Sequence, residues 1–327
     1  MIIVRNIEEL EDVIAGSCVT IGNFDGVHKG HQKLIQLACS RAKAQGLVSV
    51  VVTFDPHPLR VLRDDRTPPF ITLTEQKLEL ISQYGPQVCL LLEFNMDMAR
   101  LAPEDFVKKY LLDGLNMKEM IVGYDYHLGK GRAGNFETLK ELGAKHNFSV
   151  DRLDPVSIED AVVSSTRIRD LVQAGHVWPV RHLLGRFYQI KGEVVHGMNR
   201  GGRLLGFPTA NIKLVDELFP KPGVYAIWVE LDNKAYMGVA NIGKNPTFGN
   251  DALSVEAHII DFEGDIYGRD IRVHFVQRIR DEKKFSGIDE LKERIATDTA
   301  LGRQILSQPE AEIRLTKADF ADGSRND

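Results

Sequence analysis

The first half of the chain alternates apolar runs with segments whose apolar residues recur at helical spacing. Nearly continuous apolar runs, typical of parallel strands buried on both faces, occupy residues 18–21, 47–54, 88–92 and 120–122. Helical spacing predicts helices at residues 32–45, 74–84, 104–112 and 136–146, and a last strand follows at 148–153. Thr74 is the expected N-cap of the second helix, and Gly46 and Gly85 are expected to end helices. These repeated units predict an α/β doubly wound, Rossmann-like domain over residues 1–184, with ligands at the carboxyl ends of its strands.

Beyond Gly185 the apolar residues recur at every second position instead. In residues 224–231, for example, Tyr225, Ile227, Val229 and Leu231 share one face. Comparable runs occupy residues 188–195, 236–241, 254–261 and 271–279. Closely spaced strands without intervening helices predict a small antiparallel β-barrel domain over residues 185–310. Helical spacing returns at 288–306, so the barrel should end in C-terminal helices, and residues 311–327 should form a polar, frayed tail.

Composition narrows the class of protein. The 327 residues are 43 % hydrophobic and 27 % charged, as in ordinary globular proteins large enough for two domains. The net charge of −5 provides no global attraction for nucleic acid or an anionic membrane, so any anion site must be local. The apolar runs are too short to span a bilayer, and the acidic N-terminus does not look like a secretory signal. Because the three cysteines lack metal or redox spacing, we expect them to be reduced core residues of a cytoplasmic protein.

The most informative segment follows the first long apolar run. Residues 22–31 read GNFDGVHKGH, and the order is strand, glycine turn, helix. His28 and His31 should lie about 5–6 Å apart on one face of the helix start. Unpaired backbone N–H groups there carry a partial positive charge, so this corner suits a nucleotide phosphate. The alternative is a strand-to-helix turn that carries two surface histidines.

Three further segments could complete such a site. In residues 164–169, SSTRIR, the hydroxyl groups can cap a helix at 167–174 whose N-terminus faces an anion, although alone this would be only a capped helix. Residues 53–58, TFDPHP, end the second long strand with a turn fixed by two prolines. Residues 123–129, GYDYHLG, form a loop directly after another predicted strand.

The barrel half carries its own candidate site. Residues 197–211 read GMNRGGRLLGFPTAN, where glycine N–H groups and arginines suit phosphates. The Thr209 hydroxyl and the Asn211 amide oxygen suit Mg²⁺. A solvent-exposed loop would explain the glycines but not the ordered residues after them. Glu256 stands in an apolar strand, where a lone glutamate is usually solvent-facing.

Taken together, these motifs resemble those of the bacterial bifunctional riboflavin kinase/FAD synthetases over nearly the whole chain. GNFDGVHKGH resembles the HxGH signature of nucleotidyltransferases, and SSTRIR resembles the family motif ISSTxIR with Val163 in place of isoleucine. TFDPHP is similar to the TFxPHP loop on the flavin side. GYDYHLG is similar to GxDFRFG, but His127 and Leu128 stand where arginine and phenylalanine are frequent. GFPTAN matches the riboflavin kinase signature, and Glu256 matches the catalytic glutamate of that family.

The resemblance implies a role for each motif residue. In the nucleotidyltransferase half, the implied ATP-binding residues are Gly22, Phe24, His28, His31, Ser164, Ser165, Thr166 and Arg169. The implied flavin-binding residues of that half are Pro56, His57, Pro58, Asp125 and Tyr126. In the kinase half, ATP is expected to contact Gly202, Gly206, Phe207, Pro208, Thr209 and Asn211, with Thr209 and Asn211 as metal ligands. His28, His31 and Glu256 are the implied catalytic residues.

The same resemblance implies the two reactions and their ligands. ATP would phosphorylate riboflavin to FMN, and a second ATP would adenylylate FMN to FAD, both steps with Mg²⁺. No nucleic acid, membrane or obligate protein partner is implied. Two alternatives remain: a nucleotidyltransferase for another phosphorylated small molecule, which the barrel motifs disfavour, and a non-catalytic flavin- or nucleotide-binding protein.

Two other motif matches are rejected. Gly129, Gly131 and Gly134 satisfy GxGxxG, but they do not directly follow a strand and lie outside the first strand–helix unit. Residues 238–245 approach the P-loop pattern but end in Asn245 instead of Ser or Thr, with Pro246 next. We interpret this second segment as a turn of the barrel.

Overall fold

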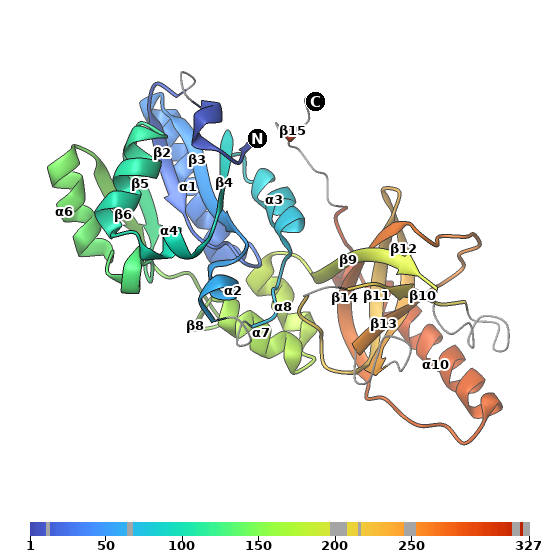
Figure 1. Cartoon of the computed structure of the whole chain (residues 1–327). Coiled ribbons are helices and arrows are strands. Elements are labelled where there is room, and N and C mark those ends of the chain that lie inside the picture. The colour runs from blue at the N-terminus through green and yellow to red at the C-terminus, as the bar shows by residue number, and fades with distance from the viewer. Residues whose placement is uncertain are drawn as a thin grey trace. The chain divides into compact units, whose positions relative to one another are not determined.

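The computed structural model describes residues 1–10, 14–63, 68–196, 208–214, 217–244, 253–315 and 321–322. They belong to two compact units (Figure 1). The first contains Met1–Pro68, Leu73–Val163 and Lys317–Asp327, and the second contains Pro69–Thr72 and Ser164–Thr316. The predicted boundary at residues 184–185 stays a prediction, since compactness groups residues 164–184 with the barrel.

The first unit is built on a parallel sheet, as predicted. Its strands are β1 (Ile2–Val4), β2 (Ser17–Ile21), β3 (Val48–Asp55), β4 (Val88–Glu93), β5 (Met117–Gly123), β6 (Ser149–Leu153) and β15 (Ala321–Asp322). Their spatial order is β15-β1-β4-β3-β2-β5-β6, and neighbouring strands run parallel. The strand β15 comes from the segment expected to be a frayed tail, but it pairs with β1.

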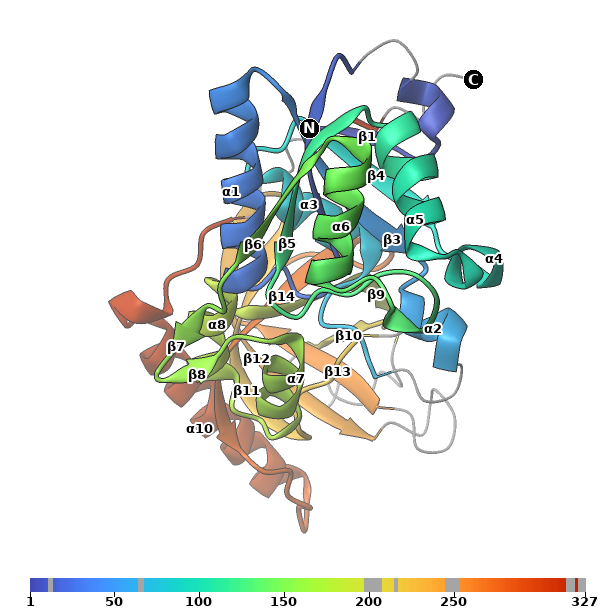
Figure 2. The ribbon, with the colours of Figure 1, turned by 90° about the vertical axis from the view of Figure 1, so that its left-hand side faces the viewer.

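Alternate residues of each central strand enter two different cores, which explains the continuous apolar runs. In β3, Val50 and Val52 belong to one core and Val51 to the other, and all three are at most 1 % exposed. The first core lies under α5 (Pro103–Phe106), the π-helical η3 (Val107–Asp113) and α6 (Phe136–His146). The second lies under α1 (Lys29–Gln45) and α3 (Thr74–Ser82). Figure 2 shows α5 and α6 in front of the sheet.

The helix ends test the predicted caps. Gly46 ends α1 in the left-handed conformation, with φ 67°, and Gly85 also has a positive φ of 79°. The predicted end at Gly46 is confirmed, whereas α3 ends at Ser82 with Gln83 as its C-cap, so the end predicted at Gly85 lies beyond the helix. Thr74 is not an N-cap: Leu73 holds that position, and the Thr74 hydroxyl donates instead to Asp55 Oδ1 at 2.7 Å. That prediction was wrong because a carboxylate from β3 competes for the hydroxyl.

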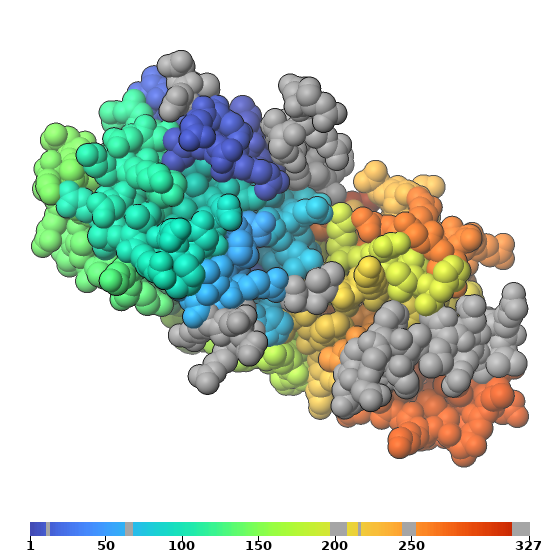
Figure 3. All heavy atoms as spheres, viewed as in Figure 1, coloured from blue at the N-terminus to red at the C-terminus, as the bar shows by residue number. Residues whose placement is uncertain are grey.

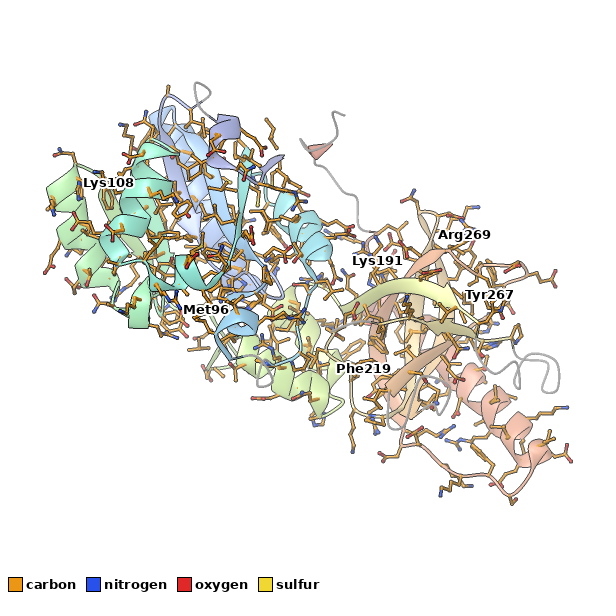
Figure 4. The ribbon with its side chains drawn as sticks, in the orientation of Figure 1. Met96, Lys108, Lys191, Phe219, Tyr267 and Arg269 are labelled. Carbon is orange, nitrogen blue, oxygen red and sulfur yellow. The ribbon has the colours of Figure 1, made fainter. Side chains whose placement is uncertain are left out.

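Several short elements of the first unit were not predicted. They are η1 (Ile7–Leu10), α2 (Pro58–Arg63), α4 (Met96–Arg100), η4 (Lys130–Arg132), β7 (Ser157–Ile158) and β8 (Ala161–Val162). Such elements span too few residues for a period to be recognisable. Met96 of α4, labelled in Figure 4, is 46 % exposed.

The second unit contains a closed antiparallel barrel, which confirms the second prediction. Its strands are β9 (Tyr188–Val195), β10 (Ala210–Ile212), β11 (Gly223–Leu231), β12 (Lys234–Lys244), β13 (Leu253–Ile259) and β14 (Asp270–Arg280). They close in the order β10-β13-β12-β11-β14-β9. Tyr225, Ile227, Val229 and Leu231, predicted to share a face, are all buried. The outer positions include Lys191 on β9, which is labelled in Figure 4. Its Nζ lies 3.9 Å from Asp270 Oδ2.

Residues 238–244, interpreted as a barrel turn, lie within strand β12. That interpretation was wrong, although the rejection of a P-loop holds, because a strand offers no helix N-terminus for a phosphate. Gly238 is needed there because a Cβ atom would lie 2.8 Å from the carbonyl oxygen of His258 on β13. Asn245 and Pro246 lie outside the described residues.

Helices cover part of the outside of the barrel. They are α8 (Val177–Leu184), α10 (Ile288–Leu306) and the 3-10 turn η6 (Pro309–Ala311), while α7 (Ser165–Gln173) packs on α8. The predicted helix 288–306 is confirmed, and its orange atoms form part of the exposed surface in Figure 3. Ala311 is fully buried and its carbonyl oxygen accepts a bond from Trp228 Nε1 at 2.7 Å, so the segment predicted as a polar tail begins by packing on the barrel.

We expect a fragment that begins at Ser164 to be more stable than one that begins at Arg186. Only the longer fragment keeps α8, whose Trp178 packs against Phe187 with ring centroids 5.9 Å apart. Each buried apolar side chain contributes about 1.5–3 kcal/mol, so the shorter fragment should melt more than about 4 °C lower. Thermal unfolding of both fragments, with a common C-terminus, measures this difference. Equal melting temperatures would place α8 outside the cooperative unit of the barrel.

Candidate active sites

The first candidate site lies where the order of the parallel strands reverses. From β2 the chain proceeds through β3 and β4 on one side and through β5 and β6 on the other. Ligands of doubly wound sheets bind at such switch points, outside the carboxyl ends of the strands. The turn after β2 leads to the two histidines at the start of α1, and the other loop follows Gly123, the last residue of β5. Both motifs therefore flank the switch point, where a ligand is predicted to bind.

The turn after β2 has an unusual backbone. Phe24 and Val27 have positive φ angles of 51° and 39°, and both side chains are fully buried. A positive φ costs of order 1–3 kcal/mol for residues other than glycine, so the buried side chains must hold the turn in place. Gly22, at its start, continues the sheet by donating its N–H to Val52 O at 3.1 Å.

The two histidines lie against each other at the start of α1. Their ring centroids are 3.6 Å apart with an interplanar angle of 16°, so the two rings are stacked. His28 is the N-cap, and its Nδ1 accepts the backbone N–H of His31 at 3.3 Å. A neutral His28 that accepts at Nδ1 carries its proton on Nε2, where it can donate to a phosphate oxygen. Gly30 leaves room for this ring, since a Cβ atom there would lie 3.1 Å from His28 Cε1.

His31 is held neutral. Burial, followed by the neighbouring His28 and Lys77, lowers its pKa well below the usual value. Phe24 packs edge-on against its ring, with centroids 5.2 Å apart. Its buried Nδ1 has no hydrogen-bond partner among the described residues. His31 therefore retains hydrogen-bonding capacity for a ligand at the positive end of the helix.

The flavin-side turn begins at the end of the neighbouring strand. The Asp55–Pro56 peptide bond is cis, α2 begins at Pro58, and His57 Nδ1 accepts the N–H of Leu59 at 3.1 Å. Thr53 Oγ1 donates to the carbonyl oxygen of Asn23 at 3.3 Å. This bond joins the end of β3 to the histidine turn, so the structure brings these two motifs to one edge of the sheet.

The loop after β5 contains the predicted flavin-binding residues Asp125 and Tyr126, which differ in their exposure. Asp125 is exposed, whereas Tyr126 packs partly into the core, and burial raises the pKa of its hydroxyl. His127 Nδ1 lies 3.2 Å from Arg132 Nη2, so a guanidinium is present beside the position where the family often has arginine. Arg132 was not predicted as a site residue. The loop closes through paired Leu128 and Gly134, which supports the rejection of a dinucleotide fingerprint.

The serine motif, residues 164–169, lies in the second unit. Ser164 caps α7, and its Oγ accepts the N–H of Arg167 at 3.2 Å. The capping prediction is confirmed, although the helix begins at Ser165, two residues earlier than predicted. Thr166 is exposed, and Arg169 Nε donates to the carbonyl oxygen of Pro69 at 3.0 Å. Joint binding of one triphosphate by this motif and the histidines stays a prediction.

The second candidate site lies on three strands of the barrel. Glu256 of β13 is paired in register with Asn211 of β10 on one side and with Asn241 of β12 on the other. Directly paired residues point to the same face, with Cβ atoms about 4.5–5.5 Å apart. The structure thus brings Asn211 and Glu256 together, and it adds Asn241, which was not predicted. A single sequence contains no signal for such pairing.

Asn211 offers an acceptor atom for a ligand. The residue is 6 % exposed, and its Oδ1 is buried without a hydrogen-bond partner in the described part of the chain. Thr209 is partly exposed, and Pro208 O lies 2.9 Å from His258 Nδ1. The predicted residues Gly202, Gly206 and Phe207 lie outside the described residues. Within the described ranges, no group of three or more His, Cys, Asp or Glu side chains could hold a metal.

Comparisons with known proteins match both halves of the chain. The family model for FAD synthetase matches residues 11–167, and the model for riboflavin kinase matches residues 184–306. A bifunctional riboflavin kinase/FMN adenylyltransferase of Pseudomonas fluorescens is 37 % identical over 306 residues, covering 93 % of this chain and 98 % of the relative. The protein of the same name from Bacillus subtilis is 40 % identical over 290 residues, with 87 % and 90 % covered.

A solved structure shares the fold of the whole chain. It is a crystal structure described as a macrolide-efflux protein from Streptococcus pneumoniae, with a TM-score of 0.80 and 33 % identity. The match covers 92 % of this chain and 98 % of that one. Among the described helices of this chain, none is both long and apolar enough to cross a membrane.

Proposed function

This chain belongs to the family of bifunctional riboflavin kinase/FMN adenylyltransferases, and we propose that its barrel makes FMN from riboflavin while its parallel-sheet unit helps to make FAD from FMN. ATP is the second substrate of both reactions. The observation that carries the proposal is that each half gathers its own motif residues: the stacked His28 and His31 at the switch point, and the paired Asn211 and Glu256 on the barrel.

In adenylyl transfer, an FMN phosphate oxygen attacks the α-phosphorus of ATP, and the bond to the β-phosphate oxygen breaks to release pyrophosphate. This reaction needs positioning and charge stabilisation more than covalent help from the protein. His28 would donate from Nε2 to a phosphate oxygen, and the N-terminus of α1 would add its positive dipole. The cis-prolyl turn at Pro56 and His57 would hold the flavin side.

In the kinase reaction, Glu256 would accept the proton of the terminal ribityl hydroxyl. The hydroxyl oxygen then bonds to the γ-phosphorus of ATP, and ADP leaves with the electrons of the broken bond. Thr209 and Asn211 would hold Mg²⁺, and the partnerless Asn211 Oδ1 is an oxygen donor of the type that this cation prefers. When bound, Mg²⁺ would neutralise part of the phosphate charge.

We also place the protein in the cytoplasm. Cys18, Cys39 and Cys89 are all free, and Cys18 and Cys89 are fully buried. Unpaired cysteines suit a reducing compartment. ATP and Mg²⁺ are both available there.

A time course with riboflavin, ATP and Mg²⁺ tests the proposal. Chromatography should show FMN appearing first and FAD following, while a second reaction that starts from FMN should form FAD directly. A nucleotidyltransferase for another substrate would leave both flavins unchanged. A non-catalytic binding protein would bind flavin without converting it. Unconverted riboflavin and FMN would therefore contradict the proposal.

A further inference from the structure

Lys77 is a buried cation beside the histidine corner for which the reaction scheme so far has no role. It belongs to α3 and is 5 % exposed. Its Nζ donates to the carbonyl oxygen of Phe54 at 2.9 Å, next to the last residue of β3. The ammonium therefore lies at the carboxyl end of the sheet, beneath the residues that carry the flavin-side turn.

The charges around Lys77 come from both site motifs. Burial lowers the pKa of Lys77, while the charges of Cys89, Asp55 and Asp25 raise it. Burial also raises the pKa of Cys89 to about 12, so its thiol is neutral at pH 7. The acidic groups left beside Lys77 are the side chains of Asp25 and Asp55. Asp25 belongs to the histidine turn and is 4 % exposed, whereas Asp55 ends β3.

Stability alone does not explain a lysine at this position. Removing an ammonium group from water costs several kcal/mol, and a buried ion pair is often no more stabilising than well-packed apolar residues of similar volume in place of both partners. Here the charge lies beside a corner suited to phosphates, where Asp25 and Asp55 alone would repel a polyphosphate. A fixed positive charge beneath them removes that repulsion.

We propose that Lys77 is a positioning residue for adenylyl transfer, because its buried ammonium offsets Asp25 and Asp55 so that the histidine corner accepts the polyphosphate of ATP. The inference rests on the proposed function of the first unit. It concerns the affinity and placement of ATP, whereas the kinase reaction on the barrel should not depend on Lys77.

The first test compares the full-length Lys77→Met variant with Lys43→Met, which removes an exposed lysine from α1. With FMN supplied, Lys77→Met should lower kcat/KM for ATP about ten- to thirtyfold, the effect of losing one charge about 10 Å from a phosphate in surroundings of effective dielectric constant about 20. Its melting temperature should fall, because the buried Asp25 carboxylate loses its compensating charge, while FMN formation from riboflavin should be normal. Lys43→Met should match the wild type in all three measurements.

The second test is charge compensation. Asp55→Asn keeps an oxygen for the bond from Thr74 but removes one negative charge. In the Lys77→Met/Asp55→Asn double variant, assayed at a temperature where both variants are folded, kcat/KM for ATP should recover part of the loss, whereas a merely structural lysine would leave kcat/KM of the folded single variant normal.

Two results would overturn the inference: equal kcat/KM for ATP in Lys77→Met and Lys43→Met, or a double variant in which the melting temperature recovers but kcat/KM for ATP does not. A wild-type protein that makes no FAD from FMN would instead contradict the proposed function.

Discussion

Glu256→Gln should lower FMN formation from riboflavin about 10²–10⁴-fold, the usual effect of removing a positioned general base. Glutamine keeps the size of the side chain and its hydrogen-bonding groups but cannot accept the ribityl proton. The pairing of Glu256 with Asn211 and Asn241 should persist, because it is made by backbone bonds. Initial rates of FMN formation, measured with saturating ATP and Mg²⁺, provide the comparison.

The matched control for this variant is adenylylation of supplied FMN by the same preparation, which should proceed at the wild-type rate. Unchanged kinase turnover would make Glu256 an ordinary strand residue and place the base elsewhere. Loss of both activities would show that its role is structural.

His31→Ala should slow FAD formation from supplied FMN about 10²–10³-fold, because it removes a preorganised group that stabilises charge on the phosphates. We expect a comparable loss for His28→Ala, which also removes the cap of α1. FMN formation from riboflavin should be unaffected in both variants. His176→Ala, which removes an exposed histidine of the second unit, serves as the matched control.

A comparison of His31→Ala with His31→Gln separates a catalytic role of this histidine from a packing role. His31 touches both His28 and Phe24, so its removal could also loosen the turn. His31→Gln restores most of the volume and a hydrogen-bond donor, and it should recover part of the rate. A near-normal rate of FAD formation in His31→Ala would exclude this histidine from the mechanism.

The sequence predicted those parts of the fold that repeat a physical pattern over many residues. Val50 to Val52 are apolar without alternation because both faces of β3 are covered, and Tyr225 to Leu231 alternate because one face lines the barrel. The strand β10 escaped prediction because its three residues are too few to show a period. Thr74 failed as a cap because Asp55, distant in sequence, binds its hydroxyl.

The candidate sites were predictable where a motif is continuous in sequence and not where it depends on tertiary contacts. The histidine turn could be located because His28 and His31 are three residues apart on a helix start. The neighbours Asn241 and Arg132 were missed, since strand pairing and loop closure bring them to the sites. Lys77 occupies a polar position of an amphipathic helix, where a lysine normally reaches solvent, and only its burial distinguishes it.

The claim that the two reactions use separate sites can be tested by mixing full-length His31→Ala and Glu256→Gln proteins. With riboflavin, ATP and Mg²⁺, His31→Ala alone should accumulate FMN, and Glu256→Gln alone should leave riboflavin unconverted. Together they should form FAD, because FMN released by the first protein is adenylylated by the second. A mixture that forms no more FAD than the two proteins assayed separately, although Glu256→Gln uses supplied FMN, would contradict the separation of the two sites.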